Sequence, residues 1–227
     1  TISLDLTGSM HKRGYRVQST DAPLQETLAA AIVMLSGWDG SRPLHDPMCG
    51  SGTILAEALM RYCHIPAAYL RSNKEIQFLP DFDTSLWEKT ISSANAMIRP
   101  LPKGLISGSD IRSEVIAAAQ ANLERLPGAE NIDLQVKAFQ SLPLRKGLCI
   151  ITNPPYGVRL GNTATVIKLY NDLGDFLKKK CPDSESYILC GNKDLVPELR
   201  LRAHWKKSLK NGDLEVKLAK VVVRASQ

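Results

Sequence analysis

The stretch "DPMCGSGT" (Asp46 to Thr53) places two glycines between an apolar run and a helical pattern. The run "PLHD" predicts a short strand that ends near Asp46, and the residues from about Ser51 to Cys63 predict a helix. Glycine lets the backbone of such a strand-to-helix turn approach a ligand closely, at the sheet edge where α/β folds bind nucleotides. The stretch therefore predicts an α/β sheet with a nucleotide-like ligand at this turn.

The segments on either side continue the pattern. Short apolar runs alternate with helical patterns, which predicts a mostly parallel sheet covered on both faces. Further helices are expected at residues 22–35, 84–97, 113–125 and 163–180, and further strands at 104–110, 132–139, 147–152 and 186–191. Residues 204–223 alternate at period two around Asn211-Gly212, which predicts an antiparallel hairpin with these two residues in its turn. A Rossmann-like, seven-stranded sheet that ends in such a hairpin is the layout of the class I S-adenosylmethionine-dependent methyltransferases.

The composition is that of one globular domain. The 227 residues are 44% hydrophobic and 23% charged, which suffices for a single large core. No apolar run approaches the roughly 20 residues of a membrane span, so we expect a cytoplasmic protein without a membrane partner. Five cysteines without a C-x-x-C pair favour reduced thiols, and no His has a partner at ligand spacing, so no metal is expected.

The formal net charge of +6 is concentrated in two places. Between Lys178 and Gln227 there are twelve Lys or Arg and six Asp or Glu, a surplus equal to that of the whole chain. A second basic cluster, "HKRGYR" (His11 to Arg16), has Tyr15 among its charges. Basic residues spaced by an aromatic suit a nucleic-acid backbone, although a solvated surface explains such an excess about as often. RNA contacts are predicted for Lys12, Arg13, Arg16, Lys206, Lys207 and Lys210.

Two acidic residues at the ends of expected strands limit which class of ligand the site can bind. Leu55 stands where the dinucleotide fingerprint needs a third glycine, and the chain has no Gly-Lys-Ser/Thr of a P-loop. Asp46 would repel a pyrophosphate but suits the ammonium and sulfonium groups of S-adenosylmethionine. Asp110, which ends "GSD", is placed to accept hydrogen bonds from the two ribose hydroxyls of a nucleoside. The alternative is that Asp110 is only an acidic residue at the start of the next helix. With Gly50 and Gly52, these acids predict S-adenosylmethionine as the cofactor.

The stretch "ITNPPYG" (Ile151 to Gly157) ends a buried strand with an amide, two prolines and a tyrosine. The prolines cannot donate backbone hydrogen bonds, so the site offers acceptors, including the carbonyl of Pro154. The exocyclic amine of a nucleobase is a donor that fits them. If the Asn153 oxygen and that carbonyl each accept an N–H bond, they also stabilise positive charge that develops on the nitrogen during methyl transfer. Tyr156 would stack on a flipped or single-stranded base; a plain strand-stopping loop is the alternative.

Together these motifs resemble the amino-methyltransferases with an Asn/Asp-Pro-Pro-Tyr motif, and more closely the RlmL-like bacterial 23S ribosomal RNA guanine-N2 methyltransferases. The likeness runs from "DLTGSMHKRGYR" through "DPMCGSGTILAEA", "GSDI" and "NPPYGVRL" to "LRAHWKKSLKNG". It implies cofactor contacts to Pro23, Asp46, Gly50, Gly52 and Asp110, and target-base contacts to Asn153, Pro154 and Tyr156. Many relatives hold the cofactor adenine with an acid after the third strand. This chain has Ala138 and Phe139 there, so its adenine subsite stays unassigned.

The resemblance also implies a domain organisation. Residues 1–20 are expected to be a linker, and residues 21–227 the Rossmann-like methyltransferase domain. In the resembling family such a linker follows an N-terminal THUMP RNA-binding domain. The chain starts with Thr1 rather than Met, which agrees with a THUMP domain outside this sequence.

The function that the resemblance implies is methyl transfer from S-adenosylmethionine to the N2 amine of a guanine in RNA, with 23S ribosomal RNA as the expected substrate. The same acceptors fit the N6 amine of adenine in DNA or RNA, and transfer RNA is a further alternative substrate. Small-molecule and protein-glutamine methyltransferases use this motif as well, but the basic tail favours RNA. From a different class, the chain could be an RNA-binding module that keeps an inactive methyltransferase fold.

Overall fold

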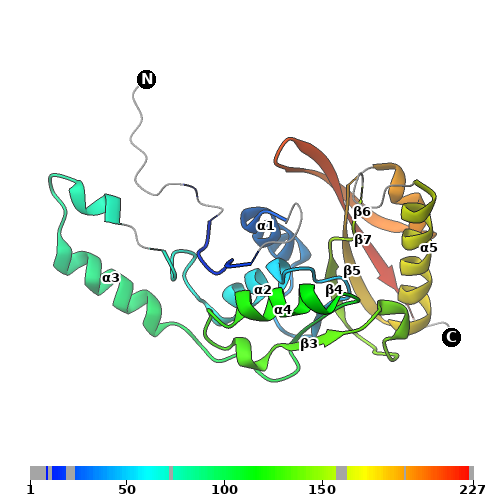
Figure 1. Ribbon diagram of the computed structural model, residues 1–227, viewed down its shortest axis with the longest axis horizontal. Coiled ribbons are helices and arrows are strands. Elements are labelled where there is room, and N and C mark those ends of the chain that lie inside the picture. The colour runs from blue at the N-terminus through cyan, green and yellow to red at the C-terminus, as the bar shows by residue number, and fades with distance from the viewer. Residues whose placement is uncertain are drawn as a thin grey trace.

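The computed structural model describes residues 9, 12–18, 24–71, 74–156, 163–191 and 193–224. Its centre is a seven-stranded sheet in the order β3-β2-β1-β4-β5-β7-β6 (Figure 1). The strands are β1 (Leu44–Asp46), β2 (Ile106–Asp110), β3 (Asp133–Val136), β4 (Cys149–Thr152), β5 (Ser184–Cys190), β6 (Ala203–Asn211) and β7 (Leu214–Val223). Strands β1 to β5 are parallel, whereas β7 is antiparallel to β5 and β6 is antiparallel to β7. The predicted fold class is therefore confirmed.

Helices cover both faces of this sheet. These are α1 (Glu26–Ser36), α2 (Thr53–Cys63), α4 (Ser113–Leu123) and α5 (Thr163–Lys180), whereas α3 (Thr84–Ala96) does not cover the sheet. Short 3-10 helices lie at Lys74–Phe78, Ala129–Asn131, Phe139–Ser141, Lys193–Leu195 and Pro197–Leu199. Side chains of α1, α2 and α4 share one hydrophobic core with the sheet, and α5 packs in a second core. Figure 1 shows α5 on the opposite side of the sheet from these three helices. Burial on both faces explains why the central strand β4, CIIT, is apolar and buried along its whole length.

Two strands begin or end at residues other than those predicted, because pairing with the neighbouring strand sets their boundaries. The strand expected at 132–139 ends at Val136, because its partner strand β2 ends at Asp110, which pairs with Val136. The strand expected at 186–191 begins earlier, at Ser184, because Ser184 pairs with Val223 of β7. These boundaries depend on pairing across the sheet and not on the local sequence.

The hairpin turn is shifted by one residue from the prediction. Asn211 is paired with Leu214, so the two turn residues are Gly212 and Asp213 rather than Asn211 and Gly212. Gly212 has a φ of 62°, a conformation that glycine adopts without steric cost and that suits the first position of a type II′ turn. The correction keeps the side chain of Asn211 on the strand, where it contacts another part of the chain.

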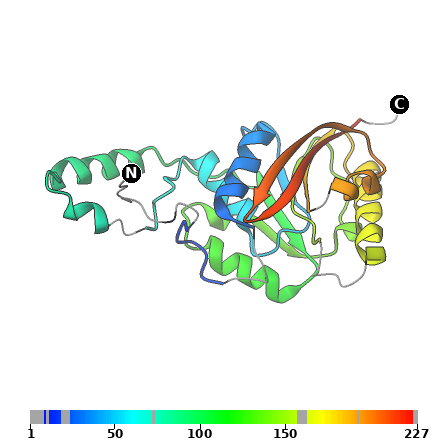
Figure 2. The same ribbon diagram turned by 90° about the horizontal axis from the view of Figure 1, so that it is seen from above.

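Helix α3 belongs to an arm that projects away from the sheet (Figures 1 and 2). None of the residues 84–96, all of which the structure describes, is buried. Asp83 caps the helix by accepting a hydrogen bond from the backbone N–H of Leu86 at 2.9 Å, and Phe82 packs on Trp87 with ring centroids 6.1 Å apart. The arm contributes nothing to the core that positions the strand ends.

The cysteines agree with the expectation of reduced thiols. All five cysteines are buried free thiols. Among the described residues, no helix is both long and apolar enough to cross a membrane. Within the same residues there is also no cluster of His, Cys, Asp and Glu that could hold a metal ion.

Candidate active site

The predicted site residues meet at the carboxyl edge of the parallel strands. Strand β1 lies between β2 and β4, so the strand-end residues Asp46, Asp110 and Asn153 come from three adjacent strands that run in the same direction. Asp46 pairs with Gly108, which places Asp110 two residues further toward the same edge. The alternation of strands and helices thus brings together residues that are far apart in the sequence, at the edge where such sheets bind ligands.

Asp46 is a buried acid with an unusual titration. Only 1% of the residue is exposed, and burial raises the pKa of its carboxyl group from 3.8 to about 7. The backbone N–H of Met48 donates to Oδ1 at 3.1 Å and lowers this pKa, while the nearby charge of Asp110 raises it. Burial makes this carboxyl group costly to ionise, and a cationic ligand beside it would favour the charged form.

Asp110 is held in place by backbone groups on both of its oxygens. The N–H of Gly50 donates to Oδ2 at 3.2 Å, and the N–H of Arg112 donates to Oδ1 at 3.2 Å. This contact joins the end of β2 to the glycine turn after β1. Ile111 follows Asp110 directly and is 70% exposed, so an apolar side chain lies at the surface next to this acid. The motif analysis did not single out Ile111, because an isolated apolar residue after a strand carries no signal.

The two glycines of the turn have different roles. Gly50 has a φ of 55°, and a Cβ built there would have no described atom within 4 Å, so the turn presents open backbone. Gly52 has a φ of 82° at the N-terminal end of α2, and a Cβ there would lie 3.2 Å from Cβ of Ala119 in α4. Gly50 is therefore the glycine that a ligand could approach, whereas Gly52 already has a packing reason to lack a side chain.

The Asn-Pro-Pro-Tyr stretch follows the fully buried strand β4. The side-chain oxygen Oδ1 of Asn153 is buried and has no hydrogen-bond partner among the described residues. Pro154 is buried as well. A buried acceptor without a partner costs free energy, on the order of 1–3 kcal/mol, unless a donor from outside the fold satisfies it. This orphan acceptor fits the predicted contact with an amine.

Tyr156 is partly buried and packs against the core shared by α1, α2 and α4. Its hydroxyl accepts a hydrogen bond from Nδ2 of Asn211 at 3.2 Å. A Cβ built on Gly191 would lie 1.8 Å from Cδ2 of Tyr156, so the tyrosine ring fills the place of a side chain at 191. Neither Gly191 nor Asn211 carries a motif signal, and the sequence analysis missed both.

The basic residues predicted to bind RNA divide into two groups. Nε of Arg13 lies 3.4 Å from Oε1 of Glu57, which also accepts from the hydroxyl of Tyr15 at 3.0 Å. Arg16 donates to the carbonyl of Leu24 at 2.7 Å and to Oγ1 of Thr53 at 2.9 Å, and it lies 3.6 Å from Glu26.

The prediction of RNA contacts for Arg13 and Arg16 therefore needs correction, because both guanidinium groups anchor residues 12–18 on α1 and α2. Lys12 is exposed, as are three lysines of β6 that have no ion pair with a described acid: Lys206, Lys207 and Lys210. We call these three residues the β6 lysines.

Two other predictions concern the cofactor. Pro23 lies outside the described residues. Phe139 is 4% exposed and packs on Phe176 of α5 with ring centroids 5.5 Å apart, so it belongs to the core on the α5 face. It is therefore not free to hold an adenine.

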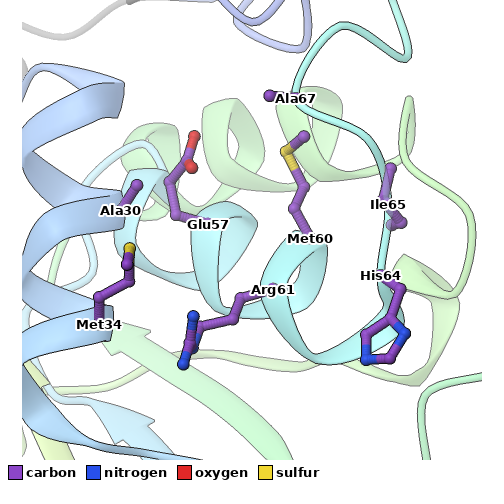
Figure 3. A pocket seen from close by; sticks show the side chains of 8 residues that line it. All are labelled: Ala30, Met34, Glu57, Met60, Arg61, His64, Ile65 and Ala67. Carbon is purple, nitrogen blue, oxygen red and sulfur yellow. The ribbon is translucent and has the colours of Figure 1, made fainter.

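A pocket of about 320 Å³ lies between α1 and the second half of α2, and Figure 3 shows the side chains that line it. It is lined by Ala30, Met34, Glu57, Met60, Arg61, His64, Ile65 and Ala67. None of these eight is a residue predicted to bind the cofactor or the base. The pocket is thus distinct from the site at the strand ends.

The strand order, the glycine turn after β1 and the acids that end β1 and β2 define the class of the protein, the class I methyltransferases. Residues 13–220 match a family model described as the RMKL-like methyltransferase domain, and the chain therefore belongs to this family. The resemblance drawn from the sequence motifs is confirmed.

Relatives and solved structures agree with this assignment. The ribosomal RNA large subunit methyltransferase K/L of Legionella pneumophila strain Lens is 39% identical over 226 residues, covering 96% of this chain and 32% of that protein. The protein SMU.472, crystallised as a complex with S-adenosylhomocysteine, has a TM-score of 0.89 at 31% identity, covering 98% of this chain and 58% of that chain. A "possible methylase" of Clostridium difficile 630 has a TM-score of 0.89 at 33% identity, covering 98% of this chain and 59% of that chain. This chain thus spans about a third of the length of the K/L relative.

Proposed function

We propose that this chain transfers a methyl group from S-adenosylmethionine to the N2 amine of a guanine in RNA, with ribosomal RNA of the large subunit as the substrate. The observation that carries the proposal is the buried Oδ1 of Asn153 at the carboxyl edge of β4, which has no hydrogen-bond partner among the residues that the structure describes. The family supports an RNA substrate, because relatives that match nearly the whole chain are named ribosomal RNA methyltransferases.

The residues at the strand ends fit S-adenosylmethionine. Asp46 would pair with the positive charge of the ligand. Gly50 has no side chain, so the ligand could approach its backbone closely. Asp110 would accept hydrogen bonds from the ribose hydroxyls. When bound, S-adenosylmethionine supplies a methyl group activated by its sulfonium. The exposed side chain of Ile111 offers an apolar surface for a planar base.

Asn153 and Pro154 would act on the target amine. An exocyclic amine is a weak nucleophile because its lone pair is delocalised into the ring. The Oδ1 of Asn153 and the carbonyl of Pro154 would each accept one N–H, which orients the nitrogen and stabilises the positive charge that it gains. Since the product amine loses its proton readily, the site needs no strong general base.

The β6 lysines would bind the RNA backbone. They lie on the edge strand of the sheet, and their charges are not neutralised by described acids. Contacts between lysines and phosphates supply affinity without sequence preference, so these lysines would not choose the target base.

Methylation of adenine N6 is the second candidate. A predicted N6-adenine-specific DNA methylase of Listeria monocytogenes has a TM-score of 0.82 at 28% identity, covering 96% of this chain and 56% of that chain. The acceptor pair of Asn153 and Pro154 would fit this amine equally well.

Labelled S-adenosylmethionine and separate pools of unmodified ribosomal RNA, transfer RNA and duplex DNA test the proposal. N2-methylguanosine in ribosomal RNA is the expected product, whereas N6-methyladenine would overturn the target. Asn153→Ala should lower turnover by about 10²- to 10³-fold with little change in the Kd for S-adenosylmethionine. Asn95→Ala, on the exposed surface of α3, is the matched control and should keep wild-type turnover. Normal turnover of Asn153→Ala would refute the role of the orphan acceptor.

A further inference from the structure

We propose that the C-terminal hairpin is part of the base-binding site, and that Asn211 and Gly191 are positioning residues for Tyr156. This inference rests on the proposed function and deepens it. It assigns a role to two residues that lie outside the Asn-Pro-Pro-Tyr motif and come from different elements of the fold.

The strand register brings the hairpin to the site. Lys217 of β7 pairs with Cys190, the last residue of β5, so residues 214–216 continue past the carboxyl end of β5. Because β6 stays paired with β7 as far as Asn211 and Leu214, the closed end of the hairpin overhangs the edge where the other strands present their site residues. The hairpin is therefore more than a cover for the edge of the sheet.

Two contacts then determine the place of the tyrosine. Nδ2 of Asn211 donates to the hydroxyl of Tyr156 at 3.2 Å. Gly191, the residue after β5, leaves a space that the ring occupies, since a Cβ there would lie 1.8–2.4 Å from Cδ2, Cγ and Cε2 of Tyr156. Gly191 is not among the described glycines with positive φ, so this close approach, and not backbone conformation, is the reason that a side chain is excluded.

The consequence for binding is preorganisation. An aromatic platform that is already oriented does not lose rotamer freedom when a base stacks on it, and such stacking is sensitive to the placement of the ring. Hydrogen bonds between uncharged side chains have modest net strength, so the loss of the Asn211 contact should lower kcat/KM for RNA by about 3- to 10-fold. A methyl group at 191 would displace the ring itself, so the effect of Gly191→Ala should be larger.

A double-mutant cycle tests whether Asn211 acts through the hydroxyl of Tyr156. The variants are Asn211→Ala, Tyr156→Phe and the two combined, assayed for methyl transfer to RNA and for the Kd of S-adenosylmethionine. We expect each single variant to lower kcat/KM, the double variant to be no worse than Tyr156→Phe, and cofactor affinity to stay at the wild-type value. Asn95→Ala, the same change on the exposed surface of α3, is the matched control and should have wild-type kcat/KM.

The outcomes separate this inference from the function on which it rests. Effects of Asn211→Ala that simply add to those of Tyr156→Phe would overturn the positioning role, because Asn211 would then act without the hydroxyl. An active Gly191→Ala variant with wild-type kcat/KM would overturn the role of the glycine. Wild-type protein that binds S-adenosylmethionine but methylates no nucleic acid would overturn the proposed function, and the role of Asn211 in base binding with it.

Discussion

Replacing Asp46 with Asn should stabilise the protein and weaken cofactor binding at the same time. The Asp46 carboxyl has a pKa of about 7 in the folded chain, against 3.8 when unperturbed, chiefly because it is buried. A raised pKa means that the folded state holds its proton more tightly than the unfolded state, so stability falls as the pH rises from about 4 to 7. The shift of about three units corresponds to a loss of about 4 kcal/mol above pH 8.

Asparagine removes this titration and keeps the local contact. Its side-chain oxygen can still accept from the backbone N–H of Met48, now 3.1 Å from Oδ1 of Asp46. We expect the free energy of unfolding of wild type, relative to Asp46→Asn, to fall by about 2.5 kcal/mol between pH 5 and pH 8. Urea unfolding of both proteins without cofactor at the two pH values measures this difference. Asp213→Asn, which removes an exposed carboxylate, should show no such change.

The same ionisation should control the affinity for S-adenosylmethionine. If the charged carboxylate is the binding form, the wild type should bind about eightfold more tightly at pH 7.5 than at pH 6, measured by calorimetry. The Asp46→Asn variant should bind weakly at both pH values and lose most of this pH dependence. A difference in unfolding free energy that does not change with pH would refute the reasoning, as would a variant with wild-type cofactor affinity.

Three further predictions follow from named contacts. Gly50→Val should cost about 1–2 kcal/mol of stability because its φ is 55°, and should weaken cofactor binding more than tenfold in calorimetry; normal affinity would show that no ligand approaches this turn. Glu57→Ala should destabilise the fold by about 3–5 kcal/mol in urea unfolding, because it leaves Arg13 buried without a counter-charge. Arg13→Met should cost less stability. Burial already raises the pKa of Glu57, so its carboxyl group can take up a proton when Arg13 is absent. Replacing the β6 lysines with Ala should lower the slope of log Kd for RNA against log salt by about 2, while the same change at the three lysines that end α5 should leave it unaltered; equal effects would mean that only net charge matters.

Several parts of this protein are predictable from local sequence. The turn from β1 to α2 is encoded by an apolar run, two glycines and a helical pattern, and the hairpin by alternation around a glycine. Asn153 and Tyr156 are recognisable because an amide, two prolines and a tyrosine follow directly after a buried apolar strand. These signals concern backbone conformation, which depends mainly on residues within a few positions of one another.

The sequence by itself determined the order of strands and helices, the glycine turn and the Asn-Pro-Pro-Tyr stretch, because each depends on neighbours along the chain. Only the tertiary structure decided which charges are free and which groups meet. Arg13 is ion-paired with Glu57, 44 residues away, so a basic cluster in the sequence became a buried anchor. Asn211 reaches Tyr156 across 55 residues because the register of β7 on β5 extends the hairpin past the sheet edge. Such pairings depend on distances in space, which composition and periodicity do not encode.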